Sequence, residues 1–223
     1  MEHGGHILVS LFCGSCSVES KLAKDFEKVI CNDSHKYLID LLNGVKNGYE
    51  LPENISESDY KHIKANKDED PVLTGFVGFG CSFGGKWFGG YARNKTRTNY
   101  ALQSKRSLLK DMANLMDATF ICKDYTDVDI PKGAIIYADP PYENTTQYSG
   151  GKFDSSKFWE YARQKSKTNL MFISELNAPD DFVPIWEKEF TRTLDVNKNN
   201  QFKATEKLFV HKDNISKLYI KKR

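Results

Sequence analysis

Short apolar runs alternate with amphipathic segments along this chain, and this alternation restricts the fold more than any other feature. The run Ile7–Phe12 is typical of a buried strand that stops at Gly14, and Val18–Lys28 then carries apolar residues at helical spacing. A second short run, Val29–Cys31, follows directly. Strand, helix and strand in this order form a parallel βαβ unit. We therefore expect an α/β fold around a largely parallel sheet.

The same alternation continues to the end of the chain. Helices are predicted at Tyr37–Val45, Tyr100–Leu115, Ser155–Lys165 and near Asp180–Glu187. Strands are predicted at Thr119–Cys122, Ala134–Ala138, Asn169–Ile173, Thr191–Val196 and Lys207–Val210. Ligands of doubly wound sheets bind beyond the carboxyl ends of the strands. We therefore expect a site at the loops that follow Phe12, Ile30, Ile121 and Ala138.

The length of 223 residues favours one domain, with room for a subdomain inserted into it. The composition changes between residues 49 and 99, first to polar and acidic residues and then to glycine and aromatic ones. This change predicts an insertion at 49–99, with residues 1–48 and 100–223 forming the main domain.

No secretory signal and no apolar run of membrane-spanning length is visible, so we expect a soluble protein of the cytoplasm. Five cysteines, an odd number scattered through the chain, fit reduced thiols better than a disulfide framework. Cys13 and Cys16 form a C-x-x-C that is typical of half a zinc site or a redox pair. No second C-x-x-C accompanies it, so packing within a loop is favoured and no metal is expected.

Asp139-Pro140-Pro141-Tyr142 follows the predicted strand Ala134–Ala138. Prolines end strands and Asp favours turns, so a plain turn is one interpretation. The other interpretation is catalytic. The lone pair of an aromatic amine is delocalised into its ring, and accepting hydrogen bonds from both amine hydrogens makes it a better nucleophile. The Asp139 carboxylate and the Pro140 carbonyl supply two acceptors, and Tyr142 offers a face on which a base can stack.

The stretch 71–110 contains no Asp or Glu but seven basic residues, although the whole chain has a net charge of only +2. A run of charge is usually a solvated face. Forty residues without an acid in a balanced chain indicate instead a contact with phosphates. We expect DNA contacts from Lys86, Arg93, Lys95 and Arg97. The aromatic residues between them are expected to be shared between core packing and DNA.

Taken in order, these motifs resemble those of the Dam-like DNA adenine-N6 methyltransferases, particularly the small phage-type members. Four segments carry the resemblance: Phe12-Cys13-Gly14-Ser15 as the first cofactor loop, Asn32-Asp33 as the ribose-binding acid, Lys123-Asp124-Tyr125 as the adenine-contacting segment, and Asp139 to Tyr142 as the catalytic tetrapeptide. The resemblance implies a Rossmann-like sheet of seven strands whose last strand is antiparallel. It also implies that the insertion between the second and third strands recognises the target DNA.

The resemblance implies a cofactor, S-adenosylmethionine, that leaves as S-adenosylhomocysteine, and it implies that Phe12, Cys13, Gly14, Ser15, Asp33, Asp124, Tyr125 and Asp139 contact it. A glycine after the first strand lets backbone amides approach the cofactor carboxylate, and an acid after the second strand can bind ribose hydroxyls. Alone, Asn32-Asp33 is more typical of a turn or helix cap. In relatives the loop equivalent to 143–154 helps to close over the flipped base, which implies that Tyr148 or Phe153 forms a second stacking wall.

The sequence thus predicts a methyltransferase acting on adenine N6 in double-stranded DNA, in a bacterial or phage-infected cell, with a role in restriction-modification or phage biology. Methylation of RNA adenine or of cytosine N4, and a non-catalytic DNA-binding protein derived from such an enzyme, remain alternatives. Such enzymes usually carry a lysine-bearing, glycine-rich motif before the first strand. His3, Gly4, Gly5 and His6 do not match it, and Cys16 stands where a second glycine is usual. Weak binding of the cofactor is therefore expected.

Overall fold

The computed structural model describes residues 6–94, 96, 98–141, 153–193 and 201–218, without the side chains of 190–193 and 201–204. Within these residues seven strands form one mixed sheet in the order β3-β2-β1-β4-β5-β7-β6. The last strand, β7 (Gln201–His211), runs antiparallel to both of its neighbours, β5 (Leu170–Glu175) and β6 (Phe182–Thr193). The predicted α/β sheet with an antiparallel last strand is therefore confirmed.

The chain divides into two compact units. The first unit consists of residues 1–12 and 129–223, and the second unit of residues 13–128. The finer division, with 49–99 as an insertion, stays a prediction. In chain order this segment lies between β2 (Lys28–Asn32) and β3 (Thr119–Ile121), where the insertion was expected.

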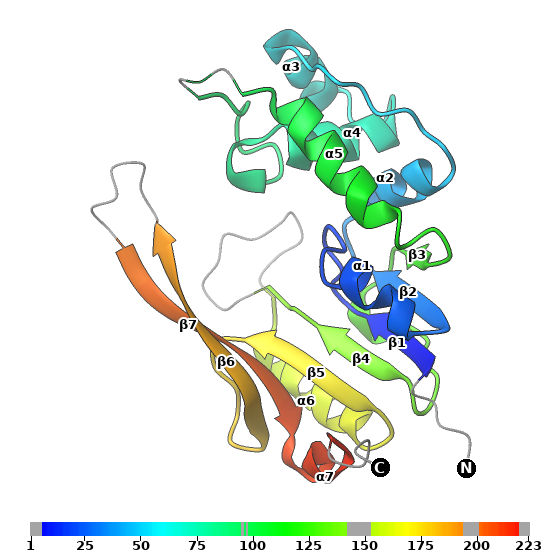
Figure 1. The fold of residues 1–223 in the computed structure, drawn as a ribbon, viewed down its shortest axis with the longest axis vertical. Coiled ribbons are helices and arrows are strands. Elements are labelled where there is room, and N and C mark those ends of the chain that lie inside the picture. The colour runs from blue at the N-terminus through cyan, green and yellow to red at the C-terminus, as the bar shows by residue number, and fades with distance from the viewer. Residues whose placement is uncertain (1–5, 95, 97, 142–152, 194–200, 219–223) are drawn as a thin grey trace. The chain divides into compact units, whose positions relative to one another are not determined.

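In the first unit, β1 (Ile7–Ser10), β4 (Ile135–Ala138) and β5 are parallel, with Val9 beside Ile136 and Ile136 beside Met171. These three side chains have no exposed surface. They are central positions of neighbouring parallel strands, for which continuous apolar runs are typical. The helix α6 (Ser155–Ser166) packs against β5 (Figure 1), and α7 (Ile215–Leu218) ends the described chain.

The helix predicted near Asp180–Glu187 is wrong, because this segment belongs to the long strand β6. Pro184 lacks the N–H that a helix interior needs, and valine, isoleucine and tryptophan surround it, which favours a strand. The pairing of β6 with β7 shifts register between Pro184 and Trp186. A proline is tolerated at such a bulge on an edge strand. Of the strand predicted at Thr191–Val196, residues 191–193 form the distal end of β6, and residues 194–196 lie outside the described residues.

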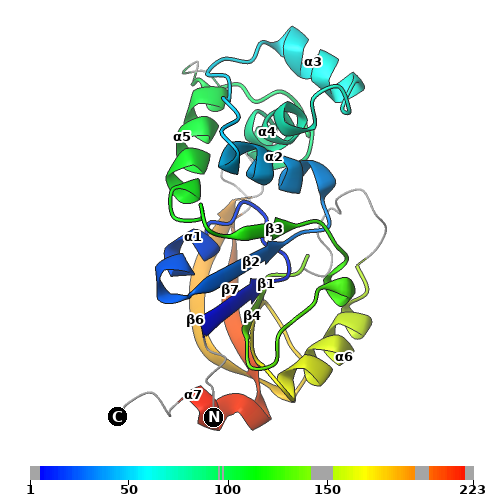
Figure 2. The ribbon, with the colours of Figure 1, turned by 90° about the vertical axis from the view of Figure 1, so that its right-hand side faces the viewer.

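The second unit pairs β2 with β3 in parallel and carries most of the helices. The helix predicted over Val18–Lys28 is shorter than expected, with α1 (Glu19–Leu22) followed by a 3-10 turn, η2 (Ala23–Asp25). Four longer helices follow: α2 (Lys36–Lys46), α3 (Glu57–Ala65), α4 (Pro71–Gly80) and α5 (Tyr100–Met112). The helix α4 contacts the other three, as Figure 2 shows for α2 and α5.

The glycine-rich stretch after Asp70 folds as the helix α4, although glycine disfavours helices. Asp70 caps its start by accepting from the amide of Leu73 at 2.9 Å. A Cβ on Gly75 would collide with the carbonyl oxygen of Tyr37 in α2, and one on Gly78 would collide with the Trp87 ring. The glycines are therefore needed where α4 approaches its neighbours most closely.

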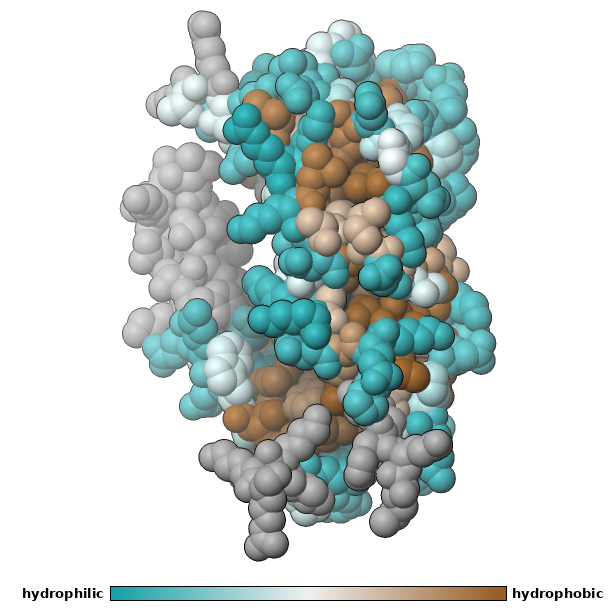
Figure 3. All heavy atoms as spheres, turned by 45° about the vertical axis from the view of Figure 1, so that its right-hand side comes forward, coloured by the Kyte–Doolittle hydropathy of each residue, from teal (hydrophilic) through white to brown (hydrophobic). Residues whose placement is uncertain are grey.

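Large apolar side chains are exposed at Phe83, Leu109 and Met116 in the second unit and at Val183, Ile185 and Trp186 in the first. On the face drawn in Figure 3, apolar residues reach the surface in patches between hydrophilic ones. Phe83, which is 60% exposed, is the most exposed of these side chains and lies within the acid-free stretch 71–110.

Candidate active site

The loop after β1 folds as a tight turn around Gly14. The amide of Cys16 donates to the carbonyl of Cys13 at 2.8 Å, and Gly14 has a φ of +49°, in the left-handed region that glycine adopts readily. The turn is attached to the end of β2, because the Cys13 amide donates to the Asn32 carbonyl at 2.8 Å. The predicted first cofactor loop and the predicted ribose-binding acid are thus brought together.

Asp33 is held by the backbone on both carboxylate oxygens. Its Oδ2 accepts from the Gly14 amide at 3.1 Å and its Oδ1 accepts from the His35 amide at 2.9 Å. Burial raises the pKa of Asp33, and the backbone hydrogen bonds, which favour the charged form, oppose this only partly. A carboxylate offers about four acceptor positions, so the backbone hydrogen bonds orient Asp33 without using its whole acceptor capacity.

The loop after β3 is joined to the loop after β2 by Asn32. The Asn32 side chain donates to the Lys123 carbonyl at 3.1 Å and accepts from the Lys123 amide at 3.1 Å. Sequence reasoning missed this role of Asn32, since Asn before Asp is a common turn pair. The three predicted cofactor segments of the second unit therefore lie together.

Asp124 and Tyr125 differ in their surroundings. Asp124 is exposed and caps the 3-10 turn η4 (Tyr125–Asp127), accepting from the amide of Thr126 at 2.9 Å and from its hydroxyl at 2.6 Å. Tyr125 is buried. The carboxylate of Asp124 is therefore accessible to a ligand, whereas most of Tyr125 contributes to packing.

The predicted catalytic tetrapeptide starts at the carboxyl end of β4, in the first unit. Asp139 is exposed and Pro140 is buried, while Tyr142 and Tyr148 lie outside the described residues. Ser10 of β1 lies beside Tyr137 of β4, and the Leu11 amide continues the pairing by donating to the Tyr137 carbonyl at 3.0 Å. Phe12 and Asp139 therefore leave the sheet at the same edge of neighbouring strands.

Phe12 and Phe153 contact each other in an edge-to-face arrangement with ring centroids 5.8 Å apart. Both rings also contact Phe158 of α6, at 5.9 Å from Phe12 and 5.7 Å from Phe153. Phe158 is fully buried, whereas Phe12 and Phe153 are half-buried. Phe153 thus anchors the start of α6 beside the first loop, and its contact with DNA stays a prediction.

The predicted DNA contacts of the second unit are placed in part. Lys86 and Arg93 are exposed, and Arg93 forms an ion pair with Glu57 at 3.1 Å. Lys95 and Arg97 lie outside the described residues. Most neighbouring aromatic residues pack against one another, as the expected core role implies: the ring contacts join Tyr37, Phe79, Trp87, Phe88, Tyr60 and Tyr91. Phe83, which sequence reasoning did not select as a DNA contact, is instead exposed.

A family comparison covers the segment that contains Asp139, whose catalytic role stays a prediction. The model of the D12 class N6 adenine-specific DNA methyltransferase family matches residues 1–72 and 85–175, more than half of the chain. The chain belongs to this family. It is therefore a methyltransferase, and its family uses S-adenosylmethionine as the methyl donor. Residues 73–84, with most of α4 and Phe83, fall between the matched ranges.

No curated protein matches the sequence. Among solved structures, a putative RNA methyltransferase from Pyrococcus horikoshii is 8% identical, with a TM-score of 0.43, over 94% of this chain and 74% of that one. A putative methylase from Haemophilus influenzae is 13% identical, with a TM-score of 0.38, over 94% and 88%. A tRNA (m1A58) methyltransferase from Aquifex aeolicus is 10% identical, with a TM-score of 0.37, over 92% and 62%. Similarities this low carry no argument about substrate.

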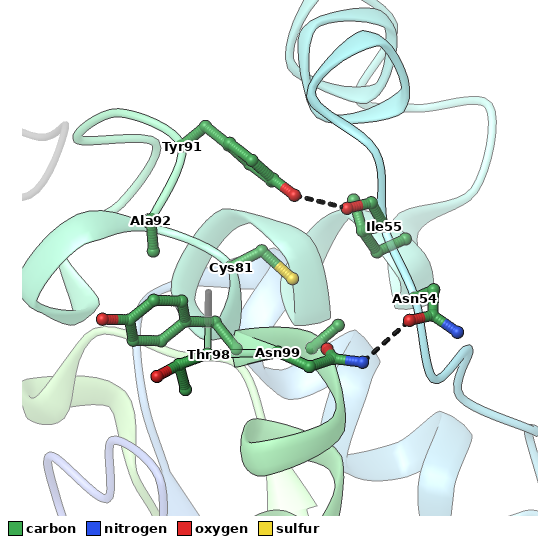
Figure 4. Close-up of a pocket in the computed structure, with 9 residues that line it drawn as sticks. Asn54, Ile55, Cys81, Tyr91, Ala92, Thr98 and Asn99 are labelled. Atoms are coloured by element: carbon green, nitrogen blue, oxygen red, sulfur yellow. Dashed lines mark hydrogen bonds between the residues drawn. The ribbon is translucent and has the colours of Figure 1, made fainter. Parts of the chain in front are cut away.

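A cavity of about 230 Å³ lies in the second unit of the methyltransferase, at the start of α5 (Figure 4). Two hydrogen bonds of 2.7 Å join its walls. The Tyr91 hydroxyl donates to the Ile55 carbonyl, and the Asn99 side-chain Nδ2 donates to Asn54 Oδ1. Its walls include none of the residues predicted to bind the cofactor. The cavity is therefore not the predicted cofactor site.

The C-x-x-C of the first loop is part of a buried thiol cluster. Hydrogen bonds to the thiols of Cys16 and Cys31 raise the pKa of Cys13. All three thiols are buried, which fits the loop-packing interpretation of the motif. Within the described ranges, no group of three or more His, Cys, Asp or Glu side chains is arranged to hold a metal ion.

No helix in the part of the methyltransferase that the structure describes has the length and apolar character needed to span a bilayer.

Proposed function

We propose that this methyltransferase transfers a methyl group to the exocyclic N6 of adenine in double-stranded DNA. The observation that carries the proposal is Asp139 at the carboxyl end of β4, exposed and followed by two prolines, in a chain that matches a DNA adenine-N6 family over this segment. Ligands of such sheets bind at this edge. Pro140 and Pro141 end the strand, and the exposed Asp139 lies directly before them at this edge.

Asp139 and the Pro140 carbonyl would act on the adenine amine as paired acceptors. Accepting hydrogen bonds from both amine hydrogens would draw the nitrogen lone pair out of conjugation with the ring, so that it can attack an electrophilic methyl group. The prolines restrict the backbone at Pro140 and Pro141, which fixes the direction of the carbonyl before the base arrives. Tyr142 would stack on the base after it leaves the duplex. The Asp139 carboxylate would stabilise the positive charge that develops on the nitrogen as it gains the methyl group, and one of the two amine protons would then be lost to solvent.

The residues of the second unit fit the cofactor that the family uses. Asp33 is oriented by backbone amides and retains acceptor capacity for the hydroxyls of a ribose. The left-handed turn at Gly14 brings backbone amides close to a ligand with no side chain in between. When bound, S-adenosylmethionine supplies a methyl group attached to a sulfonium sulfur, and the thioether that this sulfur becomes is a good leaving group. Gly14, Asp33 and Asp124 would bind and orient it.

The acid-free stretch 71–110 would hold the DNA backbone. Lys86 and Arg93 are exposed there, and the exposed ring of Phe83 lies close to Lys86 in sequence. Cations neutralise the phosphates of double-stranded DNA, and an exposed apolar ring can contact its bases. The Glu57 partner of Arg93 is itself on the surface, so the pair is weak and phosphate can replace it.

The protein is incubated with methyl-labelled S-adenosylmethionine and double-stranded DNA, and the DNA is digested to nucleosides. Label in N6-methyldeoxyadenosine supports the proposal. Label in N4-methyldeoxycytidine, or label only when RNA replaces DNA, would assign another substrate. DNA binding without transfer to either nucleic acid would favour a non-catalytic protein.

A further inference from the structure

His35 joins the predicted ribose-binding acid to an aromatic cluster. Its amide donates to Asp33 Oδ1 at 2.9 Å. Its ring contacts the Trp87 ring edge-to-face at 4.3 Å and the Phe79 ring at 4.9 Å. Burial lowers the pKa of His35, so the ring is neutral at neutral pH and packs as an aromatic ring. One residue therefore contacts the cofactor acid through its backbone and the cluster through its side chain.

Trp87 belongs to the turn Phe83–Gly90, which carries the exposed Phe83 and Lys86. The turn is closed by a hydrogen bond from the Phe83 amide to the Gly90 carbonyl at 2.8 Å. It is attached to α4 by the Phe88 amide, which donates to the Gly78 carbonyl at 2.8 Å. A movement of Trp87 therefore moves the surface that is proposed to meet DNA.

The Trp87 ring has little freedom to move independently of His35. It stacks on Tyr37 with centroids 5.4 Å apart and an interplanar angle of 19°. It also occupies the space over Gly78, where even a Cβ would collide with it. Closely packed rings of this kind transmit a displacement because the interior is nearly incompressible. Part of this cluster lies in residues 73–84, which the family model does not match.

We propose that His35 is a positioning residue that couples cofactor binding at Asp33 to DNA binding at the turn Phe83–Gly90. The inference rests on the proposed function, because it takes a ribose as the ligand of Asp33 and DNA as the ligand of the turn. Ribose hydroxyls that bind Asp33 would shift its Oδ1, which accepts from the His35 amide. The His35 ring would then displace the Trp87 ring that it contacts. By reciprocity, DNA that repositions the turn changes the affinity for the cofactor by the same factor.

The test measures this coupling factor by calorimetry. S-adenosylhomocysteine is titrated into wild type and His35→Ala, each with and without saturating sheared, unmethylated double-stranded DNA. In wild type, DNA should tighten S-adenosylhomocysteine binding by about fivefold or more, the usual range for coupled sites. In His35→Ala the factor should fall close to one, whatever the affinity of the variant for each ligand alone. His35→Phe, which keeps a planar ring, should restore the coupling, and His62→Ala on the surface of α3 should leave it unchanged.

A spectroscopic measurement keeps the inference falsifiable if His35→Ala folds poorly. The chain has three tryptophans, and a variant with both Trp159→Phe and Trp186→Phe retains only Trp87. S-adenosylhomocysteine should then change the fluorescence of Trp87, and an unchanged signal at saturation contradicts the coupling. The coupling is also contradicted if the coupling factor is the same in wild type and His35→Ala, or if it equals one in wild type. Neither result contradicts the proposed function. Failure of wild type to bind S-adenosylhomocysteine, with or without DNA, overturns both.

Discussion

The amide of Gly14 donates to the carboxylate of Asp33 at 3.1 Å, joining the loops that follow the first two strands of the chain. The bond exists because Gly14 has a φ of +49°, a conformation that L-residues adopt with strain. A Cβ at this position would meet no described atom within 4 Å. The strain of the backbone, and not a collision, is therefore what a substitution would add.

Gly14→Ala should lower the stability by about 1–2 kcal/mol, the cost of the left-handed conformation for a residue with a side chain. It should also weaken S-adenosylhomocysteine binding, because the amide that orients Asp33 moves. Chemical denaturation and calorimetry measure the two effects. An alanine variant with unchanged cofactor affinity would show that the turn does not position Asp33.

Asp33→Asn should separate stability from cofactor binding. Burial raises the pKa of Asp33, so the folded protein binds this proton more tightly than the unfolded chain does. Stability from this group is fully present below the unfolded value of about 3.9 and is lost as the pH rises through the higher folded pKa. Above that pKa the free-energy penalty of burying the charged Asp33 carboxylate no longer changes with pH. Asp33→Asn does not titrate here, so its stability should lack this loss with rising pH. It should nevertheless bind S-adenosylhomocysteine more weakly, because an amide oxygen accepts hydrogen bonds less strongly than a carboxylate.

Denaturation of both proteins across this pH range provides the measurement. The stability of wild type relative to Asp33→Asn should fall from acid pH upward and then level off. A wild type that gains stability relative to the variant over the same range would mean that the hydrogen bonds from Gly14 and His35 outweigh burial.

Gly75→Ala and Gly44→Ala form a matched pair at the contact between α2 and α4. A Cβ on Gly75 meets the backbone carbonyl of Tyr37, whereas one on Gly44 meets the side-chain methyls of Val72 at 2.6 Å. A side chain can rotate away and a backbone carbonyl cannot. Gly75→Ala should therefore cost about 1–3 kcal/mol in the free energy of unfolding, and Gly44→Ala clearly less. Thermal unfolding of the two variants tests the order, and equal losses would contradict the packing described for α4.

Replacing Arg93, Lys95 and Arg97 together by Ala should weaken binding to all DNA sequences. Each phosphate contact that is lost should also flatten the dependence of log affinity on log salt by up to about one unit. Binding measured over a series of salt concentrations gives the slope for wild type and variant. An unchanged slope would mean that these residues form only a solvated face.

The ends of the strands in this methyltransferase could be predicted from the sequence, whereas the contacts between its loops could not. The end of the strand before Asp139 is predicted by the two prolines that follow it. The helix assigned to Asp180–Glu187 overlooks Pro184 and the β-branched and aromatic residues around it, which favour the observed strand, where the register shifts between Pro184 and Trp186. The bridge from Asn32 to Lys123 joins residues far apart in sequence, and periodicity holds no information about such pairs. Likewise, the acid-free stretch could be recognised by its charge, but its glycines gave no hint of the helix α4.

The most direct test of the account compares wild type with Asp139→Ala in the labelled-cofactor assay on double-stranded DNA. Wild type should yield label in N6-methyldeoxyadenosine, and Asp139→Ala should yield none above background while its DNA affinity stays within a few-fold. This outcome follows because the carboxylate acts on the amine and the basic residues hold the phosphates. Substantial turnover by Asp139→Ala, or methylation of any base other than adenine by wild type, would contradict the account.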